Sequence, residues 1–177
     1  GKSFALAEKS NDDGIVISVD KYESKLKSIK EGAERLHLKS IKTMVADASN
    51  VEFEELFDVV FADLPCSGLG TLTKKPDIKW KREREDIALL VNTQKEIISN
   101  AVRFVKPGGA FIYSTCTIEP EENEDVISWF LAENPDFTLD PAEKYLPASI
   151  CRSGCMQTYQ HIHNVDGAFA ARLIRKP

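Results

Sequence analysis

Two cysteines and an aspartate stand directly after apolar stretches of the chain, where side chains often take part in chemistry. Asp63 and Cys66 follow residues 59–62 in the order Asp-Leu-Pro-Cys-Ser-Gly, and Cys116 stands between two threonines just after residues 110–113. A thiolate is an effective nucleophile, and a second thiol or a carboxylate beside it can carry the proton that such catalysis moves. These three residues are therefore the first candidates for a catalytic site.

Three interpretations suit a pair of cysteines at neighbouring strand ends. A disulfide is disfavoured, because four cysteines in 177 residues do not suggest a disulfide framework and a reducing cytoplasm is the expected location. A zinc site would need two further ligands, and His37 falls on a predicted helix elsewhere. Covalent catalysis, with one thiolate as nucleophile and the other as base, is the third interpretation. Cys66 alone could also be a buried structural cysteine in a turn.

The composition excludes several classes of protein. A content of 42% hydrophobic and 29% charged residues is typical of a globular protein, and 177 residues predict a single domain. No apolar run approaches the roughly 20 residues of a membrane span, and the N-terminal residues do not resemble a signal peptide. The net charge of -5 means that binding to a nucleic acid would require a local basic face.

The periodicity of apolar residues predicts strands that alternate with helices, which is typical of an open parallel α/β sheet. Strands are predicted at residues 14–20, 43–47, 59–63 and 110–113. Helices are predicted at residues 3–10, 22–36 and 87–105, the last stopped by Lys-Pro-Gly-Gly, and after Pro120. The C-terminal part predicts strands at 137–139, 156–159 and 168–174, arranged in antiparallel pairs.

The ends of the predicted strands carry residues that can do chemistry, namely Asp20, Asp47, Asp63 and the turn around Cys116. Parallel strands share one C-terminal edge, so these groups are expected to line a single crevice. An acid one strand after a glycine-rich turn commonly holds the ribose of a nucleotide-like cofactor, and Asp20 is in that place. The alternative for Asp20 is a cap for the helix near Tyr22, and Asp47 has a comparable alternative in its loop.

A basic segment follows the turn that contains Cys66. Its members are Lys74, Lys75, Lys79, Lys81, Arg82 and Arg84. Such a cluster favours phosphate binding, and a solvated charged loop is the alternative. Trp80 would either stack on a base or anchor the loop. Arg172, in a predicted terminal strand, would either pair with an acid or contact RNA.

Four motifs occur together over the whole length of the chain. They are Asp63-Leu64-Pro65-Cys66-Ser67-Gly68, Pro76-Asp77-Ile78-Lys79-Trp80, Ser114-Thr115-Cys116-Thr117 followed by Pro120-Glu121-Glu122-Asn123, and residues 166–173. In this combination the chain resembles the RsmB/Sun (Fmu) family of S-adenosylmethionine-dependent RNA cytosine-5 methyltransferases, and most closely the branch acting on 16S rRNA. The resemblance implies a Rossmann-like class I methyltransferase sheet, mostly parallel, with antiparallel C-terminal strands.

The resemblance also implies roles at the catalytic centre. Cys116 would add to carbon 6 of cytosine, which turns the ring into an enamine whose carbon 5 can attack a methyl donor. Asp63 would hold and protonate the N3 edge of the base. Cys66 would assist removal of the carbon 5 proton after methyl transfer.

The resemblance further implies how cofactor and RNA are bound. Asp20 would bind the ribose of S-adenosylmethionine and Asp47 the adenine side, with Gly1 and Lys2 near the methionine moiety and Asp63 also beside the cofactor. The RNA, expected to be 16S rRNA, would be bound through Lys74, Lys75, Lys79, Arg82 and Arg172. Neither DNA nor a membrane is expected as a partner, and no resident metal is expected.

The chain departs from the family pattern in two places. Gly1-Lys2 match the end of the family's glycine-rich cofactor loop, so the first strand and the N-terminal RNA-binding domains are expected to be missing. Residues 1–177 are therefore interpreted as the C-terminal part of a catalytic domain, and alone they are expected to bind S-adenosylmethionine weakly or not at all. Ala168 and Ala170 stand where the family prefers bulky aromatic residues.

Two rival functions belong to other classes. Cys151, Cys155, His161 and His163 have the spacing C-x3-C-x5-H-x-H, which superficially resembles a set of metal ligands, although it is tighter than in ordinary zinc fingers. The truncated beginning also suggests a catalytically silent RNA-binding fragment.

Overall fold

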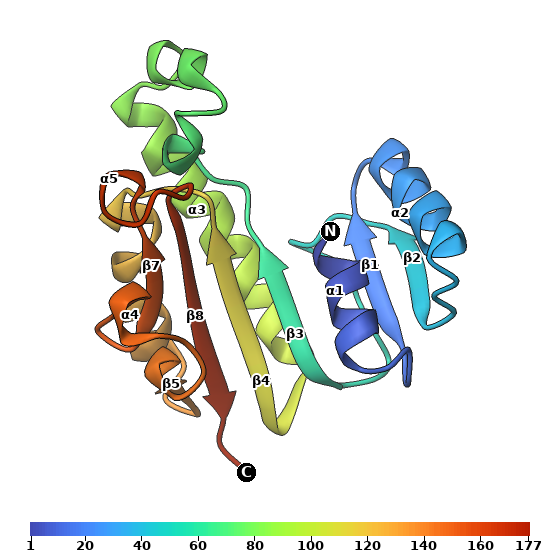
Figure 1. The fold of residues 1–177 in the computed structure, drawn as a ribbon. Helices are drawn as coiled ribbons and strands as arrows, with labels where there is room; N and C mark the ends of the chain where they lie inside the picture. Colours follow the sequence, from blue (N-terminus) through green and yellow to red (C-terminus); the bar gives the residue numbers. More distant parts are fainter. The chain divides into compact units, whose positions relative to one another are not determined.

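The computed structural model describes all residues from 1 to 177, and their contacts divide the chain into two compact units. The first unit is Gly1–Glu52 and the second is Phe53–Pro177 (Figure 1). In both units strands and helices follow one another largely as the apolar periodicity predicted. None of the helices combines the length and the apolar character that crossing a bilayer would demand.

The first unit contains two parallel strands and two helices, namely α1 (Lys2–Lys9), β1 (Val16–Asp20), α2 (Glu23–Arg35) and β2 (Ile41–Val45). The strands pair in register from Val16 opposite Ile41 to Asp20 opposite Val45. The helices touch closely at Gly32, where an added Cβ would lie 2.4 Å from the ring of Phe4. This parallel pairing places the C-terminal ends of β1 and β2 side by side.

The second unit contains a six-stranded sheet with the order β3-β4-β8-β7-β6, and β5 pairs with β8. Its strands are β3 (Phe57–Asp63), β4 (Val105–Thr115), β5 (Phe137–Asp140), β6 (Cys151–Arg152), β7 (Cys155–Thr158) and β8 (Ala168–Arg175). Its α-helices are α3 (Arg84–Ala101), α4 (Glu124–Glu133) and α5 (Gln160–His163). Only β3 and β4 are parallel, and the remaining pairs are antiparallel, as predicted for the C-terminal strands.

Several boundaries differ from the sequence prediction. Helix α3 ends at Ala101 rather than near residue 105, and a 3-10 turn (Val102–Phe104) leads directly into β4. Residues 105–109, expected to be only a helix stop, belong to β4, where the pairing with β3 shifts register. Pro lacks an amide donor and Gly108 has a φ of 76°, so this stretch interrupts the ladder without ending the strand. The α-helix expected from Pro120 begins as a 3-10 turn (Pro120–Glu122), and α4 proper starts at Glu124.

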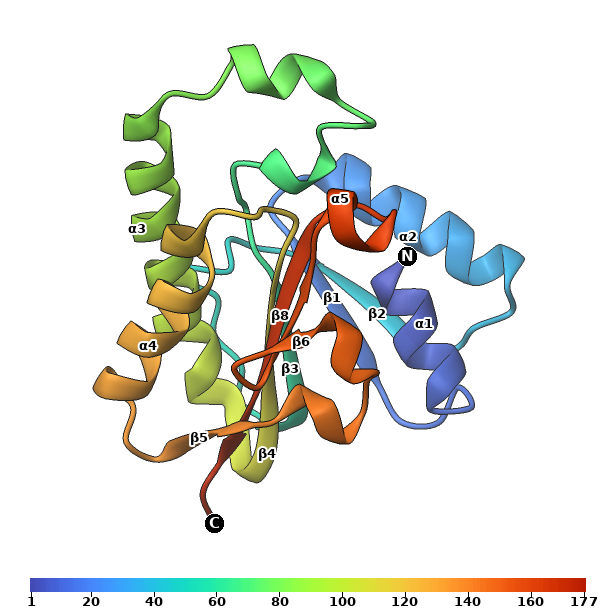
Figure 2. The same ribbon diagram turned by 60° about the vertical axis from the view of Figure 1, so that its left-hand side comes forward.

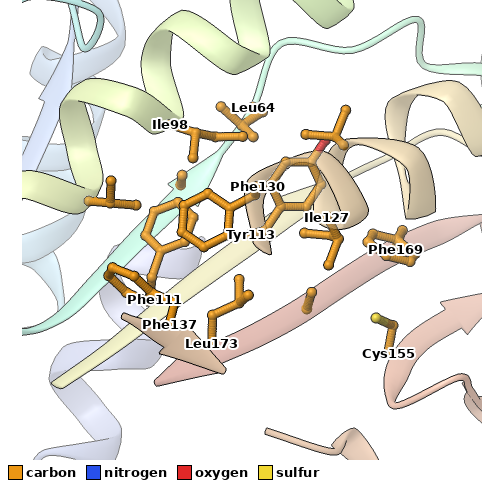
Figure 3. Packing of buried hydrophobic residues seen from close by; sticks show 14 of the residues in the cluster. Leu64, Ile98, Phe111, Tyr113, Ile127, Phe130, Phe137, Cys155, Phe169 and Leu173 are labelled. Atoms are coloured by element: carbon orange, nitrogen blue, oxygen red, sulfur yellow. The ribbon is translucent and has the colours of Figure 1, made fainter. Parts of the chain in front are cut away.

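A single apolar core lies between this sheet and helices α3 and α4, which cover the same face of it (Figure 2). Phe111 and Tyr113 are two residues apart along β4, so both side chains point to the same face of the sheet, and both are fully buried. Phe130 from α4 stacks on Phe111 with ring centroids 5.8 Å apart (Figure 3). Burial of each large apolar side chain contributes roughly 1.5–3 kcal/mol. The strands β3 and β4 are therefore held in place by a densely packed apolar core.

Candidate active site

The two candidate cysteines lie next to each other at the ends of β3 and β4. Asp63, the last residue of β3, pairs in register with Ser114 near the end of β4, so the segments that follow leave the sheet together. The sulfur atoms of Cys66 and Cys116 are 3.2 Å apart, and the Cys116 amide N–H donates to the Cys66 sulfur over 3.3 Å. The structure thus brings together two thiols that are 50 residues apart in the sequence.

The two thiols have different surroundings. Cys66 is partly buried, whereas Cys116 is exposed. The hydrogen bond with Cys116 raises the pKa of the Cys66 thiol far above its usual value, and burial raises it further. Cys66 therefore keeps its proton at neutral pH, and its S–H can be shared with the sulfur of Cys116.

Asp63 shares this edge of the sheet with the two cysteines. Its side chain is exposed, and its Oδ1 accepts a hydrogen bond from the Ser114 hydroxyl over 3.1 Å. The next backbone amide, at Leu64, donates to the Ser114 carbonyl over 3.0 Å. A carboxylate that reaches solvent three residues before Cys66 can accept a hydrogen bond from a bound molecule.

A cluster of buried polar side chains is hydrogen-bonded to the backbone on both sides of Cys66. The side chain of Gln94 on α3 donates to the Pro65 carbonyl over 2.9 Å and to Oε1 of Glu122 over 3.0 Å. The same Oε1 accepts the Ser67 amide over 2.9 Å. The Tyr113 hydroxyl donates to the Glu122 carbonyl, and burial raises the pKa of Tyr113. Residues on both sides of Cys66 are therefore tied to α3 and the 120–122 turn.

A second set of polar contacts fastens the Cys116 turn. The Thr115 hydroxyl donates to Oδ1 of Asn123 over 2.6 Å, and the side-chain nitrogen (Nδ2) of Asn123 donates to the Thr117 carbonyl over 3.1 Å. The Ser67 and Thr117 hydroxyls lie 2.7 Å apart and share a hydrogen bond, so the turn after Cys66 is joined to the turn after Cys116. Asn123 and Thr117 are both fully buried.

Two glycines complete the frame around Cys116. The Gly70 amide donates to the Cys116 carbonyl over 3.0 Å, and the Gly167 amide donates to the Gly70 carbonyl over 2.7 Å. A Cβ added at Gly70 would lie 2.1 Å from the Gly167 carbonyl oxygen. The Asp166-Gly167 motif therefore reaches the catalytic candidates through Gly70.

Sequence reasoning did not assign Gln94 and Glu122 to the site. Gln94 falls at the spacing of the apolar face of α3, and Glu122 is one of several acidic residues after Pro120, so neither stands out in the sequence. A polar residue on an otherwise apolar helix face was the available signal, because a buried amide requires hydrogen-bond partners.

The cofactor candidates of the first unit lie at the ends of its two strands. Oδ1 of Asp20 accepts the Tyr22 amide over 2.9 Å, so Asp20 also supports the start of α2, and Lys25 pairs with its other oxygen at 3.2 Å. Asp47 accepts both the amide and the hydroxyl of Ser49, and these bonds lower the pKa of Asp47. Both acids belong to the edge formed by the ends of β1 and β2.

The other two cofactor candidates are at the start of the chain. Gly1 is the N-cap of α1, and Lys2 is its first residue. That all predicted strand ends meet in a single crevice stays a prediction, because the acids of β1 and β2 and the cysteines belong to different units.

The basic segment forms an exposed loop that contains a 3-10 turn (Pro76–Trp80). Lys74 pairs with Asp166 at 2.6 Å, and Lys81 pairs with Asp77 at 2.6 Å. Arg82 donates to the Ser67 carbonyl over 3.1 Å, whereas Lys75 is exposed. These contacts fasten parts of the loop and leave other cations facing solvent.

Two further RNA candidates differ in their surroundings. Trp80 is 82% exposed beneath the ammonium group of Lys79, so Trp80 does not anchor the loop in the core. Arg172 forms an ion pair with Asp140 and lies over the ring of Tyr145. For Arg172 the structure shows the acid pairing, and its contact with RNA stays a prediction.

The metal-like spacing near the C-terminus does not gather its side chains at one point. Cys155 is buried in the core, where burial raises its pKa to about 11. Both ring nitrogens of His163 lie against backbone groups of Tyr159 and Ser149. The Cys151 sulfur lies 3.4 Å from the Pro147 carbonyl. Within residues 1–177 no group of three or more potential ligands is arranged to hold a metal ion.

Comparison with solved structures identifies the fold. The chain has an α/β Rossmann-like methyltransferase fold: it superposes on a methyltransferase homolog protein from Pyrococcus horikoshii with a TM-score of 0.83 and 28% identity, covering 99% of this chain and 58% of that one. A structure of NSun6 from Pyrococcus horikoshii with SFG gives a TM-score of 0.89 and 26% identity, covering 100% of this chain and 45% of the other.

The family follows from the sequence comparisons. Residues 1–174 match the family described as 16S rRNA methyltransferase RsmB/F, and the chain belongs to this family. It is 40% identical to the probable ribosomal RNA small subunit methyltransferase B of Bacillus subtilis (strain 168), over 99% of this chain and 41% of the relative. It is 37% identical to ribosomal RNA small subunit methyltransferase B of Shewanella oneidensis, over 99% and 40%. The chain thus spans about two fifths of the length of these relatives.

Proposed function

We propose that the whole protein carrying this chain transfers a methyl group from S-adenosylmethionine to carbon 5 of a cytosine in RNA, through a covalent adduct with Cys116. The observation that carries the proposal is the 3.2 Å contact between the sulfurs of Cys66 and Cys116. Nucleophilic catalysis on a pyrimidine needs one group that adds to the ring and another that manages the proton leaving it. Family membership supports 16S rRNA as the substrate.

Cys116 is the nucleophile in this proposal because it is exposed and Cys66 is not. Carbon 5 of cytosine is a poor nucleophile. Addition of the Cys116 sulfur to carbon 6 turns the ring into an enamine, in which carbon 5 is nucleophilic enough to attack the methyl group. A neutral Cys66 thiol can donate its S–H to a negatively charged Cys116 sulfur, and hydrogen bonds to charged atoms are strong ones. Cys66 thus stabilises the attacking thiolate before addition.

Cys66 also assists release of the product. Once carbon 5 has gained the methyl group, its proton must leave, and the bond between carbon 6 and the Cys116 sulfur breaks as the ring double bond returns. Cys66 lies beside that sulfur, so it gives its own proton to the departing Cys116 sulfur and takes up the proton from carbon 5, which leaves both thiols protonated. Asp63, exposed at the end of β3, holds the N3 edge of the base and passes to it the proton that the Cys116 thiol gives up on addition, and takes that proton back when the adduct breaks down.

The residues of the first unit suit the cofactor. Asp20 and Asp47 present carboxylates at the ends of β1 and β2, and a carboxylate has lone pairs left for a ribose diol or an adenine amino group after its local bonds are made. Gly1 and Lys2 are assigned to the methionine end. S-adenosylmethionine, when bound, supplies the methyl group. The RNA is assigned to Lys74, Lys75, Lys79 and Arg82, together with Arg172.

The test uses the whole protein with its RNA and S-adenosylmethionine. A Cys66→Ala variant is expected to accumulate an RNA adduct that survives denaturation, because addition proceeds and release does not. A Cys66→Ala/Cys116→Ala double variant is the matched control and should form none. Methylation that persists in Cys116→Ala would overturn the assignment of the nucleophile.

A further inference from the structure

We propose that Gln94 and Glu122 are positioning residues that set the separation of the two sulfurs and thereby the release step. The inference rests on the proposed function. It deepens that function by naming residues that touch neither substrate nor cofactor and act through the backbone beside Cys66.

Gln94 uses the full donor capacity of its side chain within the cluster. It lies on α3 with no exposed surface. The side-chain nitrogen of a glutamine has two N–H donors, and in Gln94 these reach the Pro65 carbonyl and Oε1 of Glu122. Its oxygen lies 3.3 Å from the Tyr113 hydroxyl, whose single hydrogen is shared with the nearer Glu122 carbonyl. The side chain is therefore fixed from three directions.

Burial of Glu122 is unfavourable in free energy, which a purely structural role does not explain. It has no exposed surface and pairs with no cation, and its second oxygen, Oε2, is buried without a hydrogen-bond partner. Burial of a polar atom without a partner costs free energy that an apolar residue would avoid. What the carboxyl group supplies in return is an acceptor for the amide of Ser67 and for Gln94.

The two residues bracket one of the cysteines. The Pro65 carbonyl and the Ser67 amide flank Cys66, and both end on the Gln94–Glu122 pair. Cys116 has further contacts that do not involve this pair, through Asn123 and through Gly70, in addition to the Ser67–Thr117 bond between the two turns. Removal of the hydrogen bonds made by Gln94 and Glu122 should therefore shift Cys66 while Cys116 keeps its place.

A displaced Cys66 has a specific chemical consequence. In the proposed reaction addition is performed by Cys116, whereas removal of the carbon 5 proton depends on Cys66. A misplacement of about 1 Å can slow a step by as much as a hundredfold. Variants of Gln94 and Glu122 should consequently stall at the adduct, in a milder form of the Cys66→Ala result.

The experiment compares Gln94→Met and Glu122→Met with Glu122→Gln in the whole protein. Glu122→Gln keeps an acceptor oxygen for Ser67 and should recover most of the wild-type behaviour. Gln157→Met is the matched control, because Gln157 is also a buried glutamine but its side-chain atoms have no hydrogen-bond partners. If either methionine variant at the site fails to fold, Tyr113→Phe removes one hydroxyl from the same cluster and should act in the same direction.

Two readouts separate positioning from general destabilisation. The first is the fraction of enzyme trapped as RNA adduct relative to methyl groups transferred in a single turnover, expected to rise about tenfold or more in both methionine variants. The second needs no RNA: the rate at which diamide, a two-electron oxidant that takes up both thiol hydrogens, joins Cys66 to Cys116. This rate should fall by about tenfold in the same variants and stay unchanged in Gln157→Met.

The outcomes distinguish the two proposals. If adduct and methyl transfer fall together and the diamide rate is unchanged, Gln94 and Glu122 are merely structural and this inference is wrong. If Cys66→Ala itself forms no adduct, the proposed function fails, while the diamide rate still decides whether the pair sets the sulfur separation.

Discussion

The hydroxyls of Ser67 and Thr117, each the residue directly after a cysteine of the site, share a hydrogen bond of 2.7 Å in a fully buried position. This bond joins the turn that follows β3 to the turn that follows β4 one residue beyond the two sulfurs. Because both turns leave neighbouring parallel strands, this side-chain bond acts together with the contacts of Glu122 and Gly70 in holding them side by side. The distance between the thiols is therefore set by neighbours as much as by the cysteines themselves.

Ser67→Ala should destabilise the protein by about 1–3 kcal/mol, since it leaves the Thr117 hydroxyl buried with one bond fewer. Thr117→Val removes the other partner, and the double variant should cost less than the sum of the single variants by about 1 kcal/mol. Denaturant unfolding of the three variants measures this coupling. Strict additivity would show that the two hydroxyls do not interact.

Cys155→Val should flatten the pH dependence of stability above pH 9. Burial raises the pKa of Cys155 from 9.0 to about 11, so above pH 9 the unfolded chain loses this proton and the folded chain keeps it. The unfolding free energy should therefore fall by about 2 kcal/mol between pH 9 and 11 because of this thiol. Unfolding in urea at several pH values measures the unfolding free energy of both proteins. If it depends on pH equally in the variant and the wild type, Cys155 ionises freely in the fold and the prediction is wrong.

Gly70→Ala should abolish methyl transfer. The new Cβ would lie 2.1 Å from the Gly167 carbonyl oxygen and 2.8 Å from that of Cys116, so the backbone that holds the nucleophile must move. Gly108→Ala is the matched control: its φ of 76° makes alanine strained, by about 1 kcal/mol, but nothing lies within 4 Å of the added atom. Single-turnover methylation should be lost in the first variant and retained in the second, and activity in Gly70→Ala would contradict the role given to this close approach.

Lys75→Gln and Lys79→Gln should weaken RNA binding at low salt. Both cations are exposed on the loop that follows the Cys66 turn, and removing one cation that neutralises a phosphate should reduce the salt slope of log K by about 0.7 for single-stranded RNA. Lys106→Gln is the control, because Lys106 lies at the opposite end of β4 from Cys116. Equal salt slopes for all three variants would make the segment a solvated loop.

The periodicity of the sequence was sufficient to predict most strands and helices, and the order of strand ends predicted that Cys66 and Cys116 meet. It failed around residues 105–109, because Pro and Gly signal a break and do not reveal whether a strand resumes through it. It also failed to predict the short strand β6 and helix α5, which are too short to show a period. Apolar periodicity predicts long helices and strands well, but it does not predict short elements whose conformation depends on the residues they pair with in the fold.

The polar cluster was beyond prediction for a different reason. Gln94 fits the periodicity of an apolar helix face, and only the three-dimensional meeting of α3 with the Cys66 turn shows what its amide binds. The roles of Asp166 and Gly167 were equally hidden, because their partners Lys74 and Gly70 are more than 90 residues away. Contacts of such long separation carry no signature in one sequence.

The closeness of the two sulfurs has a practical consequence for anyone who modifies this protein chemically. At 3.2 Å the two sulfurs share a hydrogen bond, so a chemical change at one sulfur alters the surroundings of the other. An alkyl group placed on the exposed Cys116 would fill the space beside Cys66 and remove its hydrogen-bond partner. Reagents should therefore stop after a single attachment here, and counting that attachment gives a direct measure of how many molecules in a preparation are correctly assembled.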